Sequence, residues 1–126
     1  MSISILYNGC YGGFGISEDA LKMYNIKQKE MNPEFESITC GYLLSRHDPI
    51  LVEIYHELGE KFNSKYSNIK IESIQDKYIE FYIIEEYDGL ENVKIDYNAY
   101  KLEQIKNIVN STIDNDEKIN NIKLFF

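Results

Sequence analysis

Residues 46–63, RHDPILVEIYHELGEKFN, constrain the fold most, because they indicate both where a helix starts and which side it buries. Asp48 is a typical N-cap residue, and Pro49 suits the first helical position, where its missing N–H costs nothing. Apolar side chains then recur at helical spacing, at Leu51, Tyr55, Leu58 and Phe62. We therefore predict a helix over 49–62 with one stripe facing a core.

The rest of the chain predicts an α+β fold. Strand-like segments lie at 3–7, 68–74, 78–86 and 91–95, and the last three read as a meander whose second turn, 87–89, contains Gly89. Ser17 and Asp96 can cap two further helices, one over 18–29 and one ending near 113. This order predicts an antiparallel sheet of about four strands, with helices packed on one face.

The length of 126 residues fits one domain, which we place at 1–113. Residues 114–126 form a C-terminal tail that is polar until its last apolar residues, which include Phe125 and Phe126. Because two terminal phenylalanines in water would form an apolar patch, we expect the tail to dock. It docks either on its own sheet or on a second copy, which would make a homodimer.

Composition narrows the classes of partner. The formal net charge is −8, with twelve lysines and one arginine, so the chain lacks the basic footprint of a nucleic-acid-binding protein. It has neither an apolar run of about 20 residues nor a basic-then-apolar leader, so we expect no membrane partner and an intracellular location. Cys10 and Cys40 are expected to be free thiols.

The glycine loop NGCYGGFGIS, residues 8–17, resembles a phosphate loop only in its position between a strand and a helix. Its glycine spacing fits neither known form, and Glu18 and Asp19 would repel an anion at the helix start. We expect the glycines to permit close packing, with Tyr11 and Phe14 either in the core or offered to a ligand or partner.

Two kinds of chemistry can be weighed against this packing role. Cys10 with His47 or His56 has no evident third orienting group, so we predict no catalytic residues. Cys10, Cys40, His47 and His56 contain no short metal-ligand pair, so we predict neither a metal site nor a cofactor.

Arg46, the single arginine, supports a structural prediction. Its guanidinium suits a carboxylate bidentately, and the turn near Glu86, Asp88 and Glu91 is rich in acceptors. We expect Arg46 to bind one of these carboxylates and fix the helix at 49–62 against the strands. A ligand-binding role for Arg46 is the alternative.

Three stretches occur in the order CYGGFGIS, RHDPILVEIYHELGEKFN and IIEEYDGLENV, covering residues 8 to about 94. Together they resemble a family of small uncharacterised proteins of large DNA viruses, including giant viruses of amoebae and algae, and of some phages. The motifs shared with that family are CYGGF, R-x-D-P-x-L-V and EYDG-x-E. The resemblance implies a viral protein acting in the host-cell cytoplasm or the virion, and it implies no particular activity.

The sequence therefore favours a non-catalytic module that binds another protein, since tyrosine, present eleven times, suits interfaces. The candidate binding residues are Cys10, Tyr11, Phe14, Arg46 and Asp88. The alternative is a small-molecule binder or small enzyme that works at the Cys10–Tyr11 glycine loop with Arg46.

Overall fold

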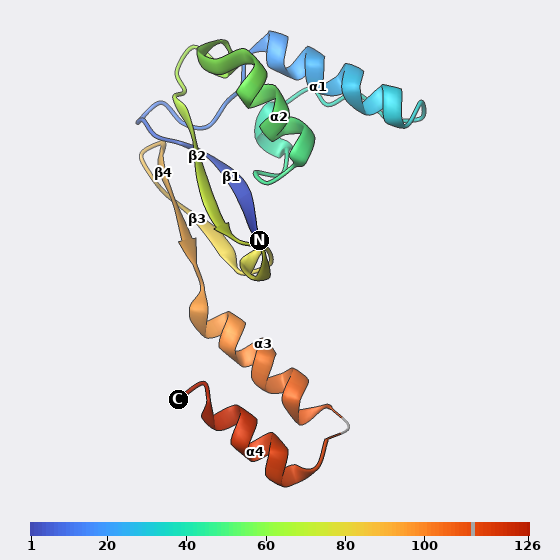
Figure 1. The fold of residues 1–126 in the computed structure, drawn as a ribbon. Helices are drawn as coiled ribbons and strands as arrows, with labels where there is room; N and C mark the ends of the chain where they lie inside the picture. The colour runs from blue at the N-terminus through green and yellow to red at the C-terminus, as the bar shows by residue number, and fades with distance from the viewer. Residues whose placement is uncertain (112) are drawn as a thin grey trace.

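A computed structural model describes residues 1–111 and 113–126 of the chain (Figure 1). The elements follow the order β1 (Ser2–Asn8), α1 (Glu18–Met31), α2 (Pro49–Leu58), β2 (Ile69–Gln75), β3 (Tyr82–Tyr87), β4 (Leu90–Ile95), α3 (Tyr97–Val109) and α4 (Asn115–Lys123). Short 3₁₀ turns occur at η1 (Gly41–Leu43), η2 (Gly59–Phe62) and η3 (Asp76–Tyr78). The mixture of helices and antiparallel strands confirms the predicted α+β class.

The ribbon made by β1 and β2 is covered on both faces. The two strands pair antiparallel with Ser2 opposite Gln75 and Asn8 opposite Ile69. Consecutive side chains of a strand point to opposite faces. Leu6 is fully buried in the core that the helices build, while its neighbour Ile5 is fully buried on the other face, toward β4. The ribbon therefore lies between the helices and the β3–β4 hairpin.

The two N-terminal helices begin where their caps predict. Ser17 accepts a hydrogen bond from the backbone N–H of Ala20, and Asp48 accepts one from Ile50. The predicted helix at 49–62 instead ends its α-helical part at Leu58, because Gly59 adopts a positive φ of 57° and the chain tightens into η2. Of the predicted stripe, Leu51 and Phe62 are buried in the core, while Tyr55 and Leu58 are partly buried and pack against it. The core consists of Leu6, Ala20, Tyr24, Leu44, Leu51, Ile54, Phe62 and Ile69.

The second sheet is the β3–β4 hairpin, whose two-residue turn is Asp88–Gly89. Both residues have positive φ, 50° and 89°, as a type I′ turn requires. The predicted turn at 87–89 is thus confirmed.

The four strands do not join into one sheet, which corrects the predicted four-stranded arrangement. The order is β1–β2 in one sheet and β3–β4 in the other. The chain after β2 turns through η3 instead of reversing tightly, and the aromatic side chains there pack with Tyr97 and Tyr100 of α3. Tyr78 and Phe81 contribute to this aromatic joint rather than to a strand, so β3 begins only at Tyr82.

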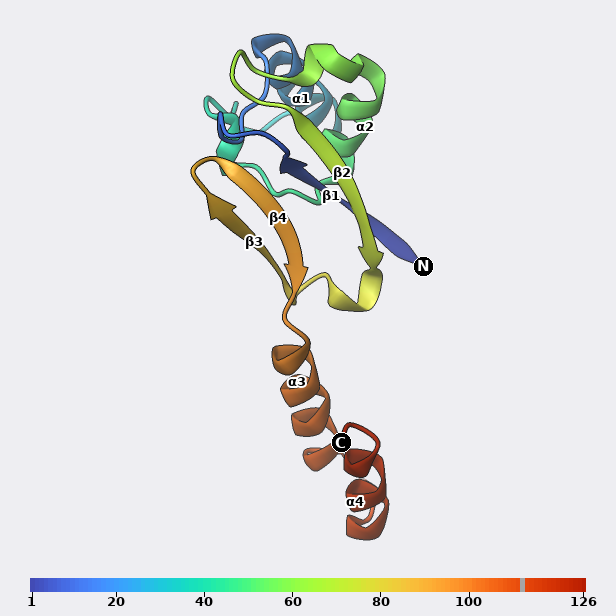
Figure 2. The same cartoon turned by 90° about the vertical axis from the view of Figure 1, so that its left-hand side faces the viewer.

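The C-terminal helices form an arm that projects from the rest of the molecule (Figures 1 and 2). The helices α1 and α2 cover the β1–β2 ribbon, whereas α3 and α4 extend away from both sheets, so the prediction that the helices pack on one face is wrong for the last two. The polar part of the tail is mostly exposed, and it forms α4, a helix that was not predicted, which Asp114 caps and which packs on α3.

Candidate functional site

The stretches CYGGFGIS, RHDPILVEIYHELGEKFN and IIEEYDGLENV meet at Arg46. Its Nη1 donates to Glu91 Oε1 at 2.6 Å, and its Nη2 donates to Glu91 Oε2 at 2.9 Å. The predicted pairing of Arg46 with the acidic turn is therefore confirmed, and Glu91 is the partner among the three candidates.

The Arg46–Glu91 pair is largely shielded from water. The side chains are 16% and 6% exposed, respectively. The guanidinium carbon lies 3.5 Å from the centre of the Phe14 ring, and the backbone carbonyl of Arg46 accepts the Leu6 N–H at 2.8 Å. A bidentate, stacked guanidinium is geometrically specific. Arg46 thus ties β1, the glycine loop and the start of α2 to the β3–β4 hairpin.

Arg46, Glu91, Phe14 and Asn8 form one cluster of contacts. The role of Asn8 in it was not predicted from the sequence. The residue is fully buried, and its backbone N–H donates to Glu91 Oε1 at 2.8 Å. Its Nδ2 donates to the carbonyls of Cys10 and Gly89, at 2.7 and 2.8 Å, and its Oδ1 accepts the Asn68 N–H at 2.9 Å. A buried amide with these partners organises the chain around it. The only signal in the sequence was its position at the end of the first strand.

The glycines of the loop permit close packing of backbones. A Cβ on Gly12 would collide with the backbone carbonyl of Tyr66. A Cβ on Gly89 would collide with the backbone of Tyr11 and Gly13. The loop is therefore held between the segment before β2 and the hairpin turn, which is the packing role predicted for it.

The remaining predicted site residues lie around this cluster. The Sγ of Cys10 is 3.2 Å from the Tyr66 carbonyl, Tyr11 is 65% exposed, and Asp88 is exposed in the turn. Five cavities of about 260 to 450 Å³ on the described part of the chain are lined by other residues. The geometry thus gives Arg46, Phe14 and Cys10 structural contacts and leaves Tyr11 and Asp88 at the surface.

His47 and Cys10 have separate partners. His47 Nδ1 lies 2.7 Å from the Tyr82 hydroxyl and 3.3 Å from Ser45 Oγ. Burial raises the pKa of Tyr82, and the positive charge of Arg46 opposes that rise. Within residues 1–111 and 113–126, no group of three or more His, Cys, Asp or Glu side chains is placed to hold a metal ion.

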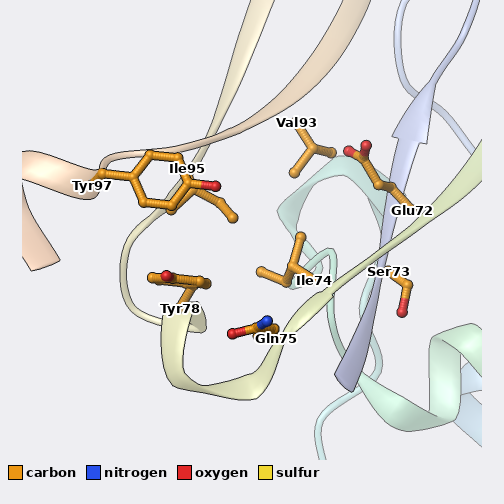
Figure 3. A pocket seen from close by; sticks show the side chains of 8 residues that line it. All are labelled: Glu72, Ser73, Ile74, Gln75, Tyr78, Val93, Ile95 and Tyr97. Carbon is orange, nitrogen blue, oxygen red and sulfur yellow. The ribbon is translucent and has the colours of Figure 1, made fainter. Parts of the chain in front are cut away.

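A groove of about 420 Å³ lies between the two sheets (Figure 3). Figure 3 shows Ile74 of β2 pointing into it, with Val93 and Ile95 of β4 opposite and Tyr78 and Tyr97 at one end. Its polar lining residues are Glu72, Ser73 and Gln75.

The direction of the backbone groups that border this groove follows from two hydrogen bonds. The N–H of Asp76, just after β2, donates to the Met1 carbonyl at 3.1 Å and so points toward β1. The N–H of Asp96, just after β4, donates to the Phe81 carbonyl at 2.7 Å and so points toward β3. Backbone groups alternate in direction along a strand, so the odd-numbered residues of β2 and β4 point away from their partner strands.

Ser73 and Gln75 of β2, and Val93 and Ile95 of β4, are therefore the residues whose N–H and C=O groups face outward, and all four line the groove. In the described part of the chain, β2 pairs only with β1 and β4 only with β3. The groove is thus bordered by two free strand edges. The sequence did not predict it, because in a continuous meander the edge of β2 would have been used by β3.

In the described part of the chain, no helix combines the length and the apolar character needed to cross a membrane. No family model, curated protein or solved structure matches this chain.

Proposed function

We propose that this chain is a non-catalytic protein-interaction module that binds an extended segment of a partner protein in the groove between β2 and β4. The observation that supports this proposal is the pair of free strand edges bordering one groove. A partner strand that enters such a groove forms main-chain hydrogen bonds with a free edge, and every second side chain of that strand contacts the residues that line the groove. Ile74, Val93 and Ile95 provide apolar contacts for those side chains.

The chemistry of the partner follows from the charge of the chain. A net charge of −8 disfavours nucleic acid and favours a neutral or basic segment of a protein. The resemblance to proteins of large DNA viruses supports a place of action in the host-cell cytoplasm or the virion. The cluster around Arg46 serves this function indirectly, because it fixes the hairpin that carries β4.

The proposal is tested by blocking one free edge with proline. Ser73→Pro removes an outward N–H from β2 and leaves the donors of the β1–β2 ladder in place. Glu86→Pro is the matched control, because Glu86 is exposed and its N–H faces outward on the far edge of β3. Linear peptides would be selected from a displayed library on the native chain, and their affinities measured on all three proteins.

We expect Ser73→Pro to lower the affinity for the selected peptides at least about tenfold, which corresponds to the loss of roughly one hydrogen bond. Glu86→Pro should leave that affinity unchanged. Peptide binding should also slow amide exchange at Ser73, Gln75, Val93 and Ile95. A library that yields no binder, or peptides that bind Ser73→Pro as tightly as the native chain, would refute the proposal.

A further inference from the structure

The helical arm lacks a core of its own. Neither α3 nor α4 contains a buried residue, although they have 13 and 9 residues and pack on each other. Isolated helices shorter than about 12 to 15 residues are marginal in water, so most of their stability comes from packing an apolar face. The arm therefore needs more apolar contact than α3 and α4 give each other.

The apolar surface for such contact is present at both ends of the arm. The apolar side chains more than half exposed are Tyr97, Leu102, Val109, Ile119, Leu124 and Phe126. At the root of the arm, where α3 follows β4, a cavity of about 300 Å³ is lined by Asn98, Lys101, Leu102, Ile105 and Phe126. Val109 ends α3 at the other end, where the chain turns between the two helices, and Ile119 lies midway along α4.

Charge indicates what covers this surface. Residues 97–126 contain four lysines and four carboxylates, so the arm is neutral and residues 1–96 carry the whole net charge of −8. Two copies therefore repel each other least when they meet through their arms and keep their charged bodies apart. A basic partner would instead be drawn to residues 1–96.

We propose that two copies of this chain pair arm to arm, in antiparallel orientation, to form a four-helix bundle. A two-fold axis perpendicular to the arms brings the same patch of both copies together with the root of each arm against the tip of the other, whereas an axis along the arms would place the two acidic bodies side by side. The root cavity of one arm then receives apolar side chains from the tip of its partner, and the two bodies lie at opposite ends. This inference does not rest on the peptide binding proposed for the groove.

The size of the arm sets the expected affinity. A helix of 13 residues is about 20 Å long, and two packed helices are about 20 Å wide, so each arm offers roughly 400 Å². The total, about 800 Å², lies below the roughly 1,200 to 2,000 Å² of stable specific interfaces, so the proposed dimer is a weak one. We therefore expect a dissociation constant on the order of 10 to 100 µM.

Sedimentation equilibrium of the full chain tests the dimer. Between about 5 and 500 µM, a range that brackets this affinity, the mass should rise from 14.8 kDa toward twice that value. Raising the salt concentration from about 0.05 to 0.5 M should strengthen association, because salt screens the repulsion between the two acidic bodies. A chain that remains a monomer at the highest concentration would overturn the inference, and so would association that weakens with salt.

Matched variants locate the interface. Leu124→Asp changes a side chain that is 82% exposed on the arm, and Leu43→Asp changes one that is 70% exposed on the body. We expect the arm variant to weaken association at least tenfold and the body variant to leave it unchanged. Helix content from circular dichroism confirms that both variants fold. Equal effects of the two substitutions would overturn the assignment of the interface to the arm.

The orientation is tested by cysteine cross-linking. Asn98→Cys places a thiol at the root of the arm, and Asn115→Cys places one at its tip. A mixture of the two single variants should form the mixed disulfide dimer faster than either variant forms its own. Faster formation of the 98–98 and 115–115 dimers would show a parallel bundle and contradict the proposed arrangement.

Discussion

Replacing Arg46 by methionine tests whether the cluster of the three motifs holds the fold together. The substitution keeps the apolar stem and removes the charge, so Glu91, 6% exposed at its side chain, loses its cation and keeps only the Asn8 N–H as a described hydrogen-bond partner. Breaking a buried ion pair on one side costs about 3 to 5 kcal/mol. We expect Arg46→Met to lower the free energy of unfolding by this amount.

Adding Glu91→Gln to Arg46→Met should recover most of the loss. The glutamine carries no charge, and its carbonyl oxygen can still accept the Asn8 N–H that Glu91 Oε1 accepts at 2.8 Å. The double variant should therefore be within about 1 to 2 kcal/mol of the parent. In urea unfolding, the single variant should lose roughly 2 M in midpoint and the double variant should regain more than half of that.

Lys27→Met is the control for this experiment, because Lys27 pairs with Glu53 and Glu57 at the surface, where an ion pair contributes about 0 to 1 kcal/mol. The reasoning would be refuted if the double variant were no more stable than Arg46→Met. It would equally be refuted if Arg46→Met cost no more than Lys27→Met.

Three further predictions concern the loop and the start of α2. Gly12→Ala should lower the free energy of unfolding, measured by heat or urea, by at least about 3 kcal/mol, because the new Cβ collides with the Tyr66 carbonyl. Gly13→Ala should lower it by only about 1 to 2 kcal/mol, because Gly13 has a φ of +88° but open space around it. Asp48→Ala should lower the free energy of unfolding by about 2 to 3 kcal/mol, since one carboxylate oxygen of Asp48 caps α2 and the other accepts the Tyr24 hydroxyl at 2.6 Å. A loss below about 1 kcal/mol would contradict this double role. Burial, and then Asp48, raise the pKa of Tyr24 from 10.0 to about 12, so the stabilisation by the protonated Tyr24 hydroxyl is present below pH 10 and is lost as the pH rises toward 12. The native chain should therefore lose its stability advantage over Tyr24→Phe across that range. An advantage independent of pH would count against the raised pKa of Tyr24.

Features that depend on a few neighbouring residues could be predicted from the sequence. The caps Ser17, Asp48 and Asp96 and the positive φ of Gly89 were all anticipated, because a helix start or a tight turn is determined within about four residues. The pairing of Arg46 was also predictable, since a single guanidinium faced a short run of carboxylates.

Features that depend on distant contacts could not be predicted in the same way. The pairing of β1 with β2 joins residues 61 to 73 positions apart, and an alternating pattern does not say which strand is the neighbour. The role of Asn8 requires the hairpin turn and the start of β2 to be already in place. The helix α4 did carry a local signal, Asp114 before two acidic residues, but its weak apolar pattern resembled a solvated tail.

The aromatic joint at the root of the arm has a consequence for how the molecule unfolds. Tyr78, Phe81 and Tyr100 form edge-to-face pairs with centroid separations of 4.9 and 5.4 Å, and α3 leads from these rings to α4. Opening the arm beyond this point exposes no buried residue of α3 or α4, so it requires much less free energy than opening the core around Leu51 and Phe62. We therefore expect the arm of the monomer to open separately from the body, so that its amides exchange with solvent through local fluctuations that leave the body folded.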